Sequence, residues 1–354
     1  MKLTDVCDFQ GGSQPPKEEW SFEEQEGYIR MLQIRDFTQS EKVVPEYVKI
    51  DNSTKICSAD DILIARYGAS IGKVLTGLAG AYNVAIMRTI PDTHIIQKKY
   101  LYYYLKSTYF QNAILNVGSR AAQAGFNKED LSKLYIECPD ISKQDATVSI
   151  LEKVEAVIDK RNVELVALDT LIKARFVELF DGKYPEDTLL NLCNIIDYRG
   201  KTPEKVECGL PFITAKNVKM HHMTLEPREY ISKETYDKVM VRGFPKEGDV
   251  VFTTEAPLGN VCRIPYFDTE FYIGQRIVTM QTDALNPTYL EYALSNEEFV
   301  RKYMGKSSGS TVTGIRVRLL EQLTIPVPPR TLQDEFSIFV KQVDKSKVAV
   351  LKIF

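Results

Sequence analysis

The residue types that most often carry catalysis are few in this chain and stand in no catalytic pattern. The three histidines are His94, His221 and His222, and none has the spacing of a metal-binding pair or of a nucleophile–base–acid triad. His221 and His222 lie together in a polar stretch, which favours a surface loop over a pair of ligands. The sequence therefore predicts no catalytic residue and no metal ligand.

Motifs for cofactors and for metal nucleases are also missing. No Gly-x-x-x-x-Gly-Lys-Ser/Thr loop is present to hold phosphates. Residues 286–289 approach the Pro-Pro-aromatic stretch of amino-methyltransferases, but they lack the second proline and predict a helix cap. Asp181 has the spacing to Lys183 of a metal nuclease, yet a long predicted helix separates it from Pro139-Asp140.

The remaining polar sites occur twice, at matched places in the two halves of the chain. Each half has a polar turn, residues 65–73 or 253–260, and a Ser/Gly-rich loop, residues 118–128 or 305–318. Backbone amides and hydroxyls in such loops can approach phosphates, while Arg, Asn and Gln can read base edges. One copy alone could be a solvated loop. Two matched copies with different side chains favour two different recognition tasks.

The two halves share four ungapped segments. Residues 100–105, 119–126, 131–139 and 144–145 match residues 289–294, 308–315, 320–328 and 333–334, each 189 positions later. Upstream, Asp61-Ile62-Leu63-Ile64 corresponds to Asp249-Val250-Val251-Phe252. Solenoid repeats are about 20–50 residues long, so this period predicts two homologous domains instead.

Each half contains patterns typical of both strands and helices. Short β-branched runs bounded by Gly, Asp and Pro predict strands and turns. Residues 98–116 and 287–303 carry apolar side chains at three- and four-residue spacing, which predicts helices. The predicted class is α+β.

A heptad pattern follows each domain. Residues 144–180 contain no Gly or Pro and predict a helix of about 55 Å, which the turn at Gly182 and the following Pro185 end. Residues 331–354 repeat the pattern in shorter form. The predicted packing positions are Leu151, Val154, Ile158, Leu165, Leu168, Ile172 and Leu179, and Phe336, Val340, Val343, Val350 and Phe354.

These two helices can pack on each other as an antiparallel coiled-coil rod that joins the two globular domains. Alternatively, each helix docks on its own domain or on a different protein, and the spacing alone does not choose. The predicted boundaries are 1–143 for the first domain, 144–183 for the central helix, 184–332 for the second domain and 333–354 for the shortened C-terminal helix.

Composition and charge limit the compartment and the class of protein. The chain has 354 residues and a formal net charge of -3, which argues mildly against a solitary DNA-binding domain. No apolar run is long enough for a membrane helix, and Asp5 and Asp8 interrupt the position of a signal peptide. Six dispersed cysteines without a Cys-x-x-Cys pair predict a reduced, cytoplasmic protein.

The chain resembles the specificity (S) subunit of type I restriction-modification systems over essentially its whole length. Residues 125–144 and 314–333 carry the resemblance. Each begins at a loop glycine, continues through Leu-x-x-Leu-x-Ile-x-x-Pro and ends at a Gln that is followed by a predicted helix.

The resemblance implies two target recognition domains, each of which reads one half of a bipartite, asymmetric DNA sequence. The helices would set the spacer between the half-sites and dock methyltransferase (M) subunits, with restriction (R) subunits joining the complex. Catalysis would lie in these partners, which would use S-adenosylmethionine, ATP and Mg²⁺. This subunit itself would hold no cofactor.

Loop composition then nominates the DNA contacts. In the first domain they are Arg66, Tyr67, Ser70, Lys73, Ser119, Arg120, Gln123, Asn127 and Lys128. In the second they are Thr254, Asn260, Arg276, Ser308, Ser310, Thr311, Arg316 and Arg318. The aligned basic residues Arg35 and Lys216 are expected to contact phosphates.

The sequence departs from the family pattern in its second helix, which is about fifteen residues shorter than the first by the heptad count. Either the rod is paired only over the shorter helix, or the gene product is truncated or recombined. Two other hypotheses stay open. One is a two-headed adaptor for protein or carbohydrate, and the other is a stand-alone DNA-modifying enzyme with a cryptic active site.

Overall fold

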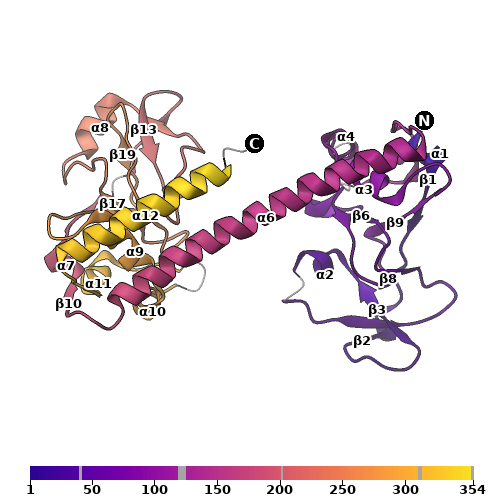
Figure 1. Cartoon of the computed structure of the whole chain (residues 1–354), viewed down its shortest axis with the longest axis horizontal. Helices are drawn as coiled ribbons and strands as arrows, with labels where there is room; N and C mark the ends of the chain where they lie inside the picture. Colours follow the sequence, from indigo (N-terminus) through magenta and orange to yellow (C-terminus); the bar gives the residue numbers. More distant parts are fainter. Residues whose placement is uncertain (40–41, 119–124, 201, 310–312, 352–354) are drawn as a thin grey trace. The chain divides into compact units, whose positions relative to one another are not determined.

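The chain forms two compact units. The computed structural model describes residues 1–39, 42–118, 125–200, 202–309 and 313–351. Unit 1 comprises residues 1–158 and unit 2 comprises residues 159–354, so the division falls within the long helix α6 (Ile141–Phe180). Figure 1 labels elements of both units, among them β6 (Leu63–Ala65) and β9 (Ile86–Pro91) in unit 1 and β17 (Val250–Thr253) and α12 (Arg330–Leu351) in unit 2.

The main sheet of unit 1 is antiparallel. Its strands, in spatial order, are β1 (Cys7–Gly11), β9 (Ile86–Pro91), β6 (Leu63–Ala65) and β7 (Val74–Leu75). Because β1 and β6 both run antiparallel to β9, they are parallel to each other, and Gly11 and Ala65 lie at the same edge of the sheet. We call this edge, where β1 and β6 end and β9 begins, the loop edge of unit 1.

A second, five-stranded sheet and short helices complete unit 1. The sheet consists of β2 (Trp20–Ser21), β4 (Glu46–Lys49), β3 (Tyr28–Leu32), β8 (Gly80–Tyr82) and β5 (Ile56–Cys57). The helices are α1 (Leu3–Val6), α2 (Ile34–Thr38), α3 (Lys98–Lys106), α4 (Thr108–Gly118) and α5 (Lys128–Leu131), with single 3-10 turns at Lys17–Glu19 and Gly68–Ser70.

Unit 2 repeats this arrangement. Its main sheet contains β11 (Asn194–Asp197), β20 (Ile277–Gln281), β17 (Val250–Thr253) and β18 (Val261–Arg263). Its second sheet contains β12 (Lys205–Val206), β16 (Tyr230–Ile231), β13 (Leu210–Ile213) and β19 (Tyr272–Ile273). The remaining strands form two pairs, β14 (Val218–Lys219) with β15 (His222–Met223) and β10 (Glu186–Thr188) with β21 (Thr324–Pro326). The loop edge of unit 2 is where β11 and β17 end and β20 begins.

Short helices and the longer α12 complete unit 2. They are α7 (Leu189–Leu192), α8 (Lys233–Val239), α9 (Pro287–Ser295), α10 (Glu297–Met304), α11 (Val317–Leu320) and α12 (Arg330–Leu351). As predicted, Asn286 caps α9 and its side chain accepts a hydrogen bond from the Thr288 amide. None of the helices in the described part of the chain is long and apolar enough to cross a membrane.

The prediction of helix over residues 98–116 and 287–303 is confirmed, with one break in each segment that the sequence pattern did not show. Ser107 separates α3 from α4, and its hydroxyl accepts a hydrogen bond from the Phe110 amide. Asn296 separates α9 from α10 and likewise accepts from the Phe299 amide. An N-cap residue within such a segment ends one helix and begins the next, while the three- and four-residue spacing of the buried side chains continues across the break.

Each main sheet is covered on both faces. In unit 2, Val250 and Phe252 of β17 pack among the helices, while Val251 packs toward the second sheet with Ile213 and Ile273. Since successive side chains of a strand point to opposite faces, a strand with two buried faces is apolar throughout. The β6 strand of unit 1 is apolar for the same reason. The predicted α+β class with two domains is confirmed.

The helix α6 begins three residues before the predicted start at residue 144. Asp140 precedes its first turn, and the carboxylate of Asp140 accepts hydrogen bonds from the Lys143 amide and the Ser142 hydroxyl. These bonds also hold the pKa of Asp140 below its usual range. The prediction missed this cap because it began at the repeated Gln144.

Within unit 2, the last turns of α6 pack against α12 in an antiparallel arrangement. Phe176 and Phe180 each lie 5.5 Å from the Phe336 ring, measured between ring centroids. Arg175 pairs with Glu335 at 3.1 Å, and Lys347 pairs with Asp169 at 2.7 Å. The α6 residue numbers fall as the α12 numbers rise, so the two helices run in opposite directions.

The predicted packing positions divide into three groups. Ile172, Phe336, Val340 and Val343 are buried in one core cluster of unit 2, with Leu168 and Leu179 partly buried against it, and Val350 is also buried. Leu151 and Leu165 have intermediate exposure. Val154 and Ile158 are 44% and 39% exposed, so no packing is observed at these two positions. Phe354 lies outside the described residues.

The contacts define the register of α6 and α12 within unit 2, where Lys347 lies opposite Asp169. The heptad count also missed Phe176 and Phe180, which are buried. With Leu168 and Ile172 they follow four-residue spacing, because this stretch of α6 packs on the domain as well as on α12.

The repeated glutamine of the sequence pattern is a buried link between each long helix and its domain. Gln144 is fully buried, accepts a hydrogen bond from the Gln97 amide at 2.8 Å and donates to the Pro139 and Ile95 carbonyls. Gln333 is 1% exposed, accepts from the Asn286 amide at 2.8 Å and donates to the Pro328 carbonyl at 2.8 Å. Each glutamine thus ties the start of α6 or α12 to the cap of α3 or α9.

Replacing Gln333 with Met keeps the volume but leaves the Asn286 amide and the Pro328 carbonyl without partners. We expect a loss of about 2–3 kcal/mol in the stability of unit 2, because orphaned buried groups carry their full desolvation cost. Hydrogen–deuterium exchange of unit 2 peptides measures this loss. Gln342→Met, at an exposed position of the same helix, is the control and should change stability by less than about 0.5 kcal/mol. Equal effects of the two variants would contradict the role of the buried amide.

Candidate nucleic-acid interface

The two polar loops of unit 1 meet at its loop edge. Tyr67, just after β6, forms a backbone bridge with Gly125 at the end of the Ser/Gly-rich loop. Arg66 donates from Nε to the Phe126 carbonyl at 3.3 Å, and its guanidinium lies 5.0 Å from the centroid of the Tyr67 ring. A Cβ atom at Gly125 would overlap the Tyr67 ring, so this close approach requires glycine.

Unit 2 has the same junction at its loop edge. Glu255 bridges to Gly314, and the Ile315 amide donates to the Thr254 carbonyl at 2.9 Å. A Cβ atom at Gly314 would lie 3.1 Å from the Glu255 Cβ atom and 3.1 Å from the Thr254 carbonyl oxygen. The turn and the loop that the sequence predicted separately are therefore one surface in each unit.

The start of the neighbouring strand completes each junction. The Arg66 amide donates to the Ala85 carbonyl at 2.8 Å, and the Thr254 amide donates to the Arg276 carbonyl at 2.9 Å. Arg66, Tyr67 and Ala85 in unit 1 thus occupy the backbone positions of Thr254, Glu255 and Arg276 in unit 2. The backbone is shared and all three side chains differ.

The other nominated residues of unit 1 that the structure describes lie in the polar turn, at α5 and in α2. Ser70 ends a 3-10 turn in the same polar turn, and Lys73 is exposed. Asn127 caps α5 by accepting from the Asp130 amide. Lys128 pairs with Asp8 and holds the pKa of that carboxyl below its usual range. Arg35 lies in α2 and pairs with Glu46.

In unit 2 the structure corrects one nominated contact. Thr254 is fully buried, so it cannot touch DNA without a change of fold. It instead supports the arginines on either side. Its hydroxyl accepts from Arg199 Nη2 at 3.0 Å and donates to the Arg276 carbonyl at 3.2 Å. The polar composition of residues 253–260 suggested that Thr254 is exposed, because threonine side chains are mostly found at the protein surface.

The remaining nominated residues of unit 2 are placed as follows. Asn260 is partly buried, and its side-chain amide donates to the Val218 carbonyl at 2.8 Å. Ser308 is exposed and its backbone pairs with Gly314. Lys216, Arg316 and Arg318 are exposed. Ser119, Arg120, Gln123, Ser310 and Thr311 lie outside the described residues.

Sequence reasoning missed three residues at the loop edge of unit 2. Glu255 occupies the position of Tyr67, and Arg199 follows β11 and reaches Thr254. Arg242 donates to the Asp197 carbonyl at 2.6 Å and to the Arg199 carbonyl at 3.2 Å. The alignment of the halves could have shown Glu255. Nothing local in the sequence marks Arg199 or Arg242, because their partners lie 43 to 55 positions away.

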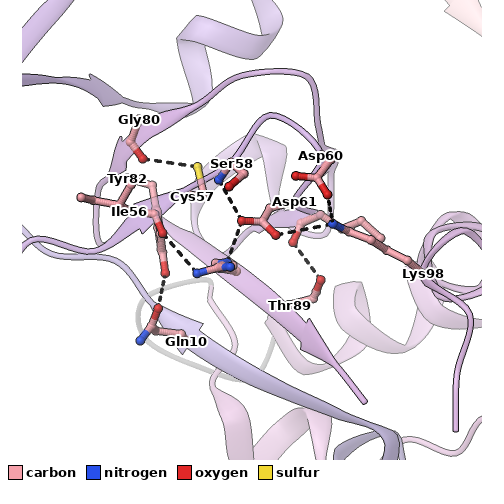
Figure 2. A network of polar contacts seen from close by, with 12 residues as sticks. Gln10, Ile56, Cys57, Ser58, Asp60, Asp61, Gly80, Tyr82, Thr89 and Lys98 are labelled. Carbon is pink, nitrogen blue, oxygen red and sulfur yellow. Dashed lines mark hydrogen bonds and ion pairs between the residues drawn. The ribbon is translucent and has the colours of Figure 1, made fainter. Parts of the chain in front are cut away.

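A buried aspartate fixes the strand that leads to each junction. Figure 2 shows Asp61, whose carboxylate accepts from the Ser58 amide at 2.9 Å and lies 3.6 Å from the Lys98 ammonium group. Arg88 pairs with the same carboxylate at 2.9 Å. In unit 2, Asp249 accepts from the Lys246 amide at 2.9 Å and from Gln281 Nε2 at 2.7 Å.

The two aspartates thus sit in matched turns with different electrostatics. Burial raises the pKa of Asp249, against the opposing effect of its hydrogen bond from Gln281. Thr279 occupies the strand position that corresponds to Arg88, by the pairing of β20 with β17 and of β9 with β6. Asp249 therefore lacks the strand arginine that its counterpart has.

His221 lies in the turn between β14 and β15, as the sequence predicted, but its side chain is only 22% exposed. Its Nδ1 atom lies 2.9 Å from the Glu291 carboxylate, which is 1% exposed, and its ring stacks on Tyr292 at 4.3 Å. Arg263 Nε donates to the same carboxylate at 2.6 Å. The described residues contain no group of three or more His, Cys, Asp or Glu side chains arranged to hold a metal ion.

Comparison with known proteins identifies the family. The family model of the type I restriction modification DNA specificity domain matches residues 1–166 and residues 187–352. The chain therefore belongs to this family and carries two copies of its domain.

Two curated relatives come from Methanocaldococcus jannaschii. The type I restriction enzyme MjaVIII specificity subunit is 22% identical, over 91% of this chain and 80% of its own length. The putative type I restriction enzyme MjaX specificity subunit is 24% identical, over 74% of this chain and 64% of its own length.

Two solved structures share the fold. A chain from a study of complex assembly and conformational transition of the type I R-M system has a TM-score of 0.56 and is 18% identical. The type I restriction-modification S subunit from M. genitalium has a TM-score of 0.51 and is 14% identical. Each comparison covers 99% of this chain and 90% of the other.

Neutralising the two matched aspartates should have different effects. Asp61→Asn removes the anion that Arg88 and Lys98 share, and we expect it to destabilise unit 1 by about 1–3 kcal/mol. Asp249→Asn should cost little at pH 7, because the raised pKa shows that the fold disfavours the ionised form. For the same reason, the Asp249 contribution to stability falls as the pH rises above the unfolded-state pKa. Hydrogen exchange of each unit from below pH 4 to pH 7 checks both expectations. Equal losses in the two variants would contradict them.

Proposed function

We propose that this protein is the DNA-specificity subunit of a type I restriction-modification complex and is not itself catalytic. Each unit reads one half of a bipartite, asymmetric target, and α6 with α12 sets the spacer and docks the methyltransferase subunits. One observation carries the proposal. The two loop edges share their backbone bonds but present different side chains, which suits two half-sites of different sequence.

The chemistry of the loop edges supports DNA as the ligand. Arg66 and Tyr67 in unit 1, and Arg199 and Arg276 in unit 2, combine cations with groups that can contact base edges or stack on bases. Exposed lysines such as Lys73 and Lys216 can neutralise phosphates. At 1.5 Å per residue, α6 is about 60 Å long, which exceeds the roughly 34–36 Å of one DNA turn.

The reactions of the complex are assigned to its other subunits. In this proposal, M subunits bind S-adenosylmethionine and R subunits use ATP and Mg²⁺, while this subunit supplies the target sequence. The complex would act in the cytoplasm. Free cysteines in the described chain fit that compartment, and burial raises the pKa of Cys7, Cys193 and Cys262 to about 12, so these thiols are poorly reactive.

Deleting the gene should erase one methylation motif from the host DNA. Single-molecule sequencing with and without the gene should show adenine methylation at a split motif, with two short half-sites around a fixed gap, that depends on this chain. The neighbouring methyltransferase must be shown to be expressed in both strains. An unchanged pattern under that condition would contradict the proposal and favour an adaptor for other ligands.

Lys216→Gln should weaken binding of the assembled complex to all DNA sequences alike. Loss of one phosphate contact should lower the slope of log affinity against log salt concentration by about one. Equilibrium binding at several salt concentrations, on specific and unrelated duplexes, measures both effects. Lys238→Gln on α8, whose partner is Glu234, is the matched control. A loss confined to the specific duplex would contradict a phosphate contact at Lys216.

A further inference from the structure

The loop edge of unit 2 carries an ion pair at the backbone positions where unit 1 has Ala85 and Tyr67. Arg276 Nε lies 3.1 Å from Glu255 Oε1, and the two side chains are 53% and 43% exposed. We propose that Arg276 and Glu255 together read one G·C base pair in the half-site bound by unit 2. This inference rests on the proposed function and names the base pair that one half-site must contain.

Both side chains project from a rigid support. The Arg276 carbonyl accepts hydrogen bonds from the Thr254 amide and hydroxyl, and Thr254 is fully buried. Glu255 is held by its backbone bridge to Gly314. A base-contacting side chain whose backbone is fixed in this way loses little conformational freedom on binding, which favours discrimination between bases.

The pair matches the major-groove edge of G·C in type and spacing. Arginine donates to guanine O6 and N7, and glutamate accepts from cytosine N4. Guanine O6 and cytosine N4 bond to each other across the base pair, so they lie about 3 Å apart. The donor and acceptor side chains lie 3.1 Å apart as well. With Nε engaged by Glu255, the terminal nitrogens of Arg276 remain to form the fork that guanine accepts.

A contact to phosphate does not account for Glu255. Arg199 and Arg276 flank the buried Thr254 hydroxyl, and Arg242 supports the Arg199 carbonyl. A carboxylate among these cations lowers the attraction for phosphates, which carry the same charge. Exposed ion pairs also contribute little to stability. In a complex with DNA, the cytosine N4 amino group is a donor for this carboxylate, whereas phosphates offer it none.

Unit 1 presents no such pair at the same backbone positions. Ala85 stands where unit 2 has Arg276, and Tyr67 stands where it has Glu255. The requirement for the G·C pair should therefore be confined to one half-site. The other half-site serves as an internal measure of folding and assembly.

The test compares the methylation motifs of variants in the host that lacks the chromosomal gene. The gene is restored as wild type, Arg276→Gln, Glu255→Gln or the control Glu234→Gln, and the genome is sequenced by a single-molecule method that detects methylated bases. We expect both reader variants to keep one half-site and the gap. Discrimination at a single G·C position of the other half-site should fall by about 5- to 150-fold. Glu234→Gln, at an exposed carboxyl on α8 that also pairs with a basic side chain, should keep the wild-type motif.

The outcomes separate this inference from the proposed function. A wild-type gene that directs no split motif overturns the proposed function itself. A wild-type split motif that both reader variants leave unchanged overturns only the base-reading role. Equal loss of methylation at every site in both variants also overturns it, because the pair would then support the fold or general DNA binding. Relaxation at one G·C position, with the other half-site intact, supports it.

Discussion

The attachment of each long helix to its domain depends on one buried side-chain amide in each copy of the domain. Gln144 and Gln333 use both ends of the amide at once, accepting from the cap of α3 or α9 and donating to carbonyls that precede α6 or α12. A buried amide that loses one of these partners carries a desolvation cost, so one position of the helix on its domain is favoured over the others. Each glutamine thereby holds its long helix against the helix cap that follows the main sheet of its domain.

The periodic and repeated features of the fold could be predicted from the sequence, because they depend on neighbours within a few residues. The two domains, the long helix after each and the Asn286 cap are of this kind. The breaks at Ser107 and Asn296 leave the apolar spacing intact, and four-residue packing at Phe176 and Phe180 appears only when α6 meets the domain. Of the candidate site, composition found the loops. It could not show that Tyr67 meets Gly125, or that Thr254 is buried beneath two arginines, since these contacts join distant segments.

The two copies also show how one fold tolerates different electrostatics at the same place. Asp61 is balanced by Arg88 and Lys98, whereas Asp249 relies on an amide and a backbone hydrogen bond and has a pKa raised by burial. Both carboxylates close the turn before the central strand by accepting an amide three residues upstream. The geometry of the turn is therefore kept by the hydrogen bond, while the surrounding charges are free to differ between copies.

The separation between buried support and exposed side chains has a consequence for how such a gene can evolve. Glycines 125 and 314, the two glutamines and Thr254 are held by close packing or by full burial, so most changes there would reduce the amount of folded protein. Tyr67, Glu255 and Arg276 are at least one-third exposed. Point mutations at these positions can accumulate with little effect on stability. Under the proposed function, a lineage would then drift from one target sequence to another through intermediates that still fold.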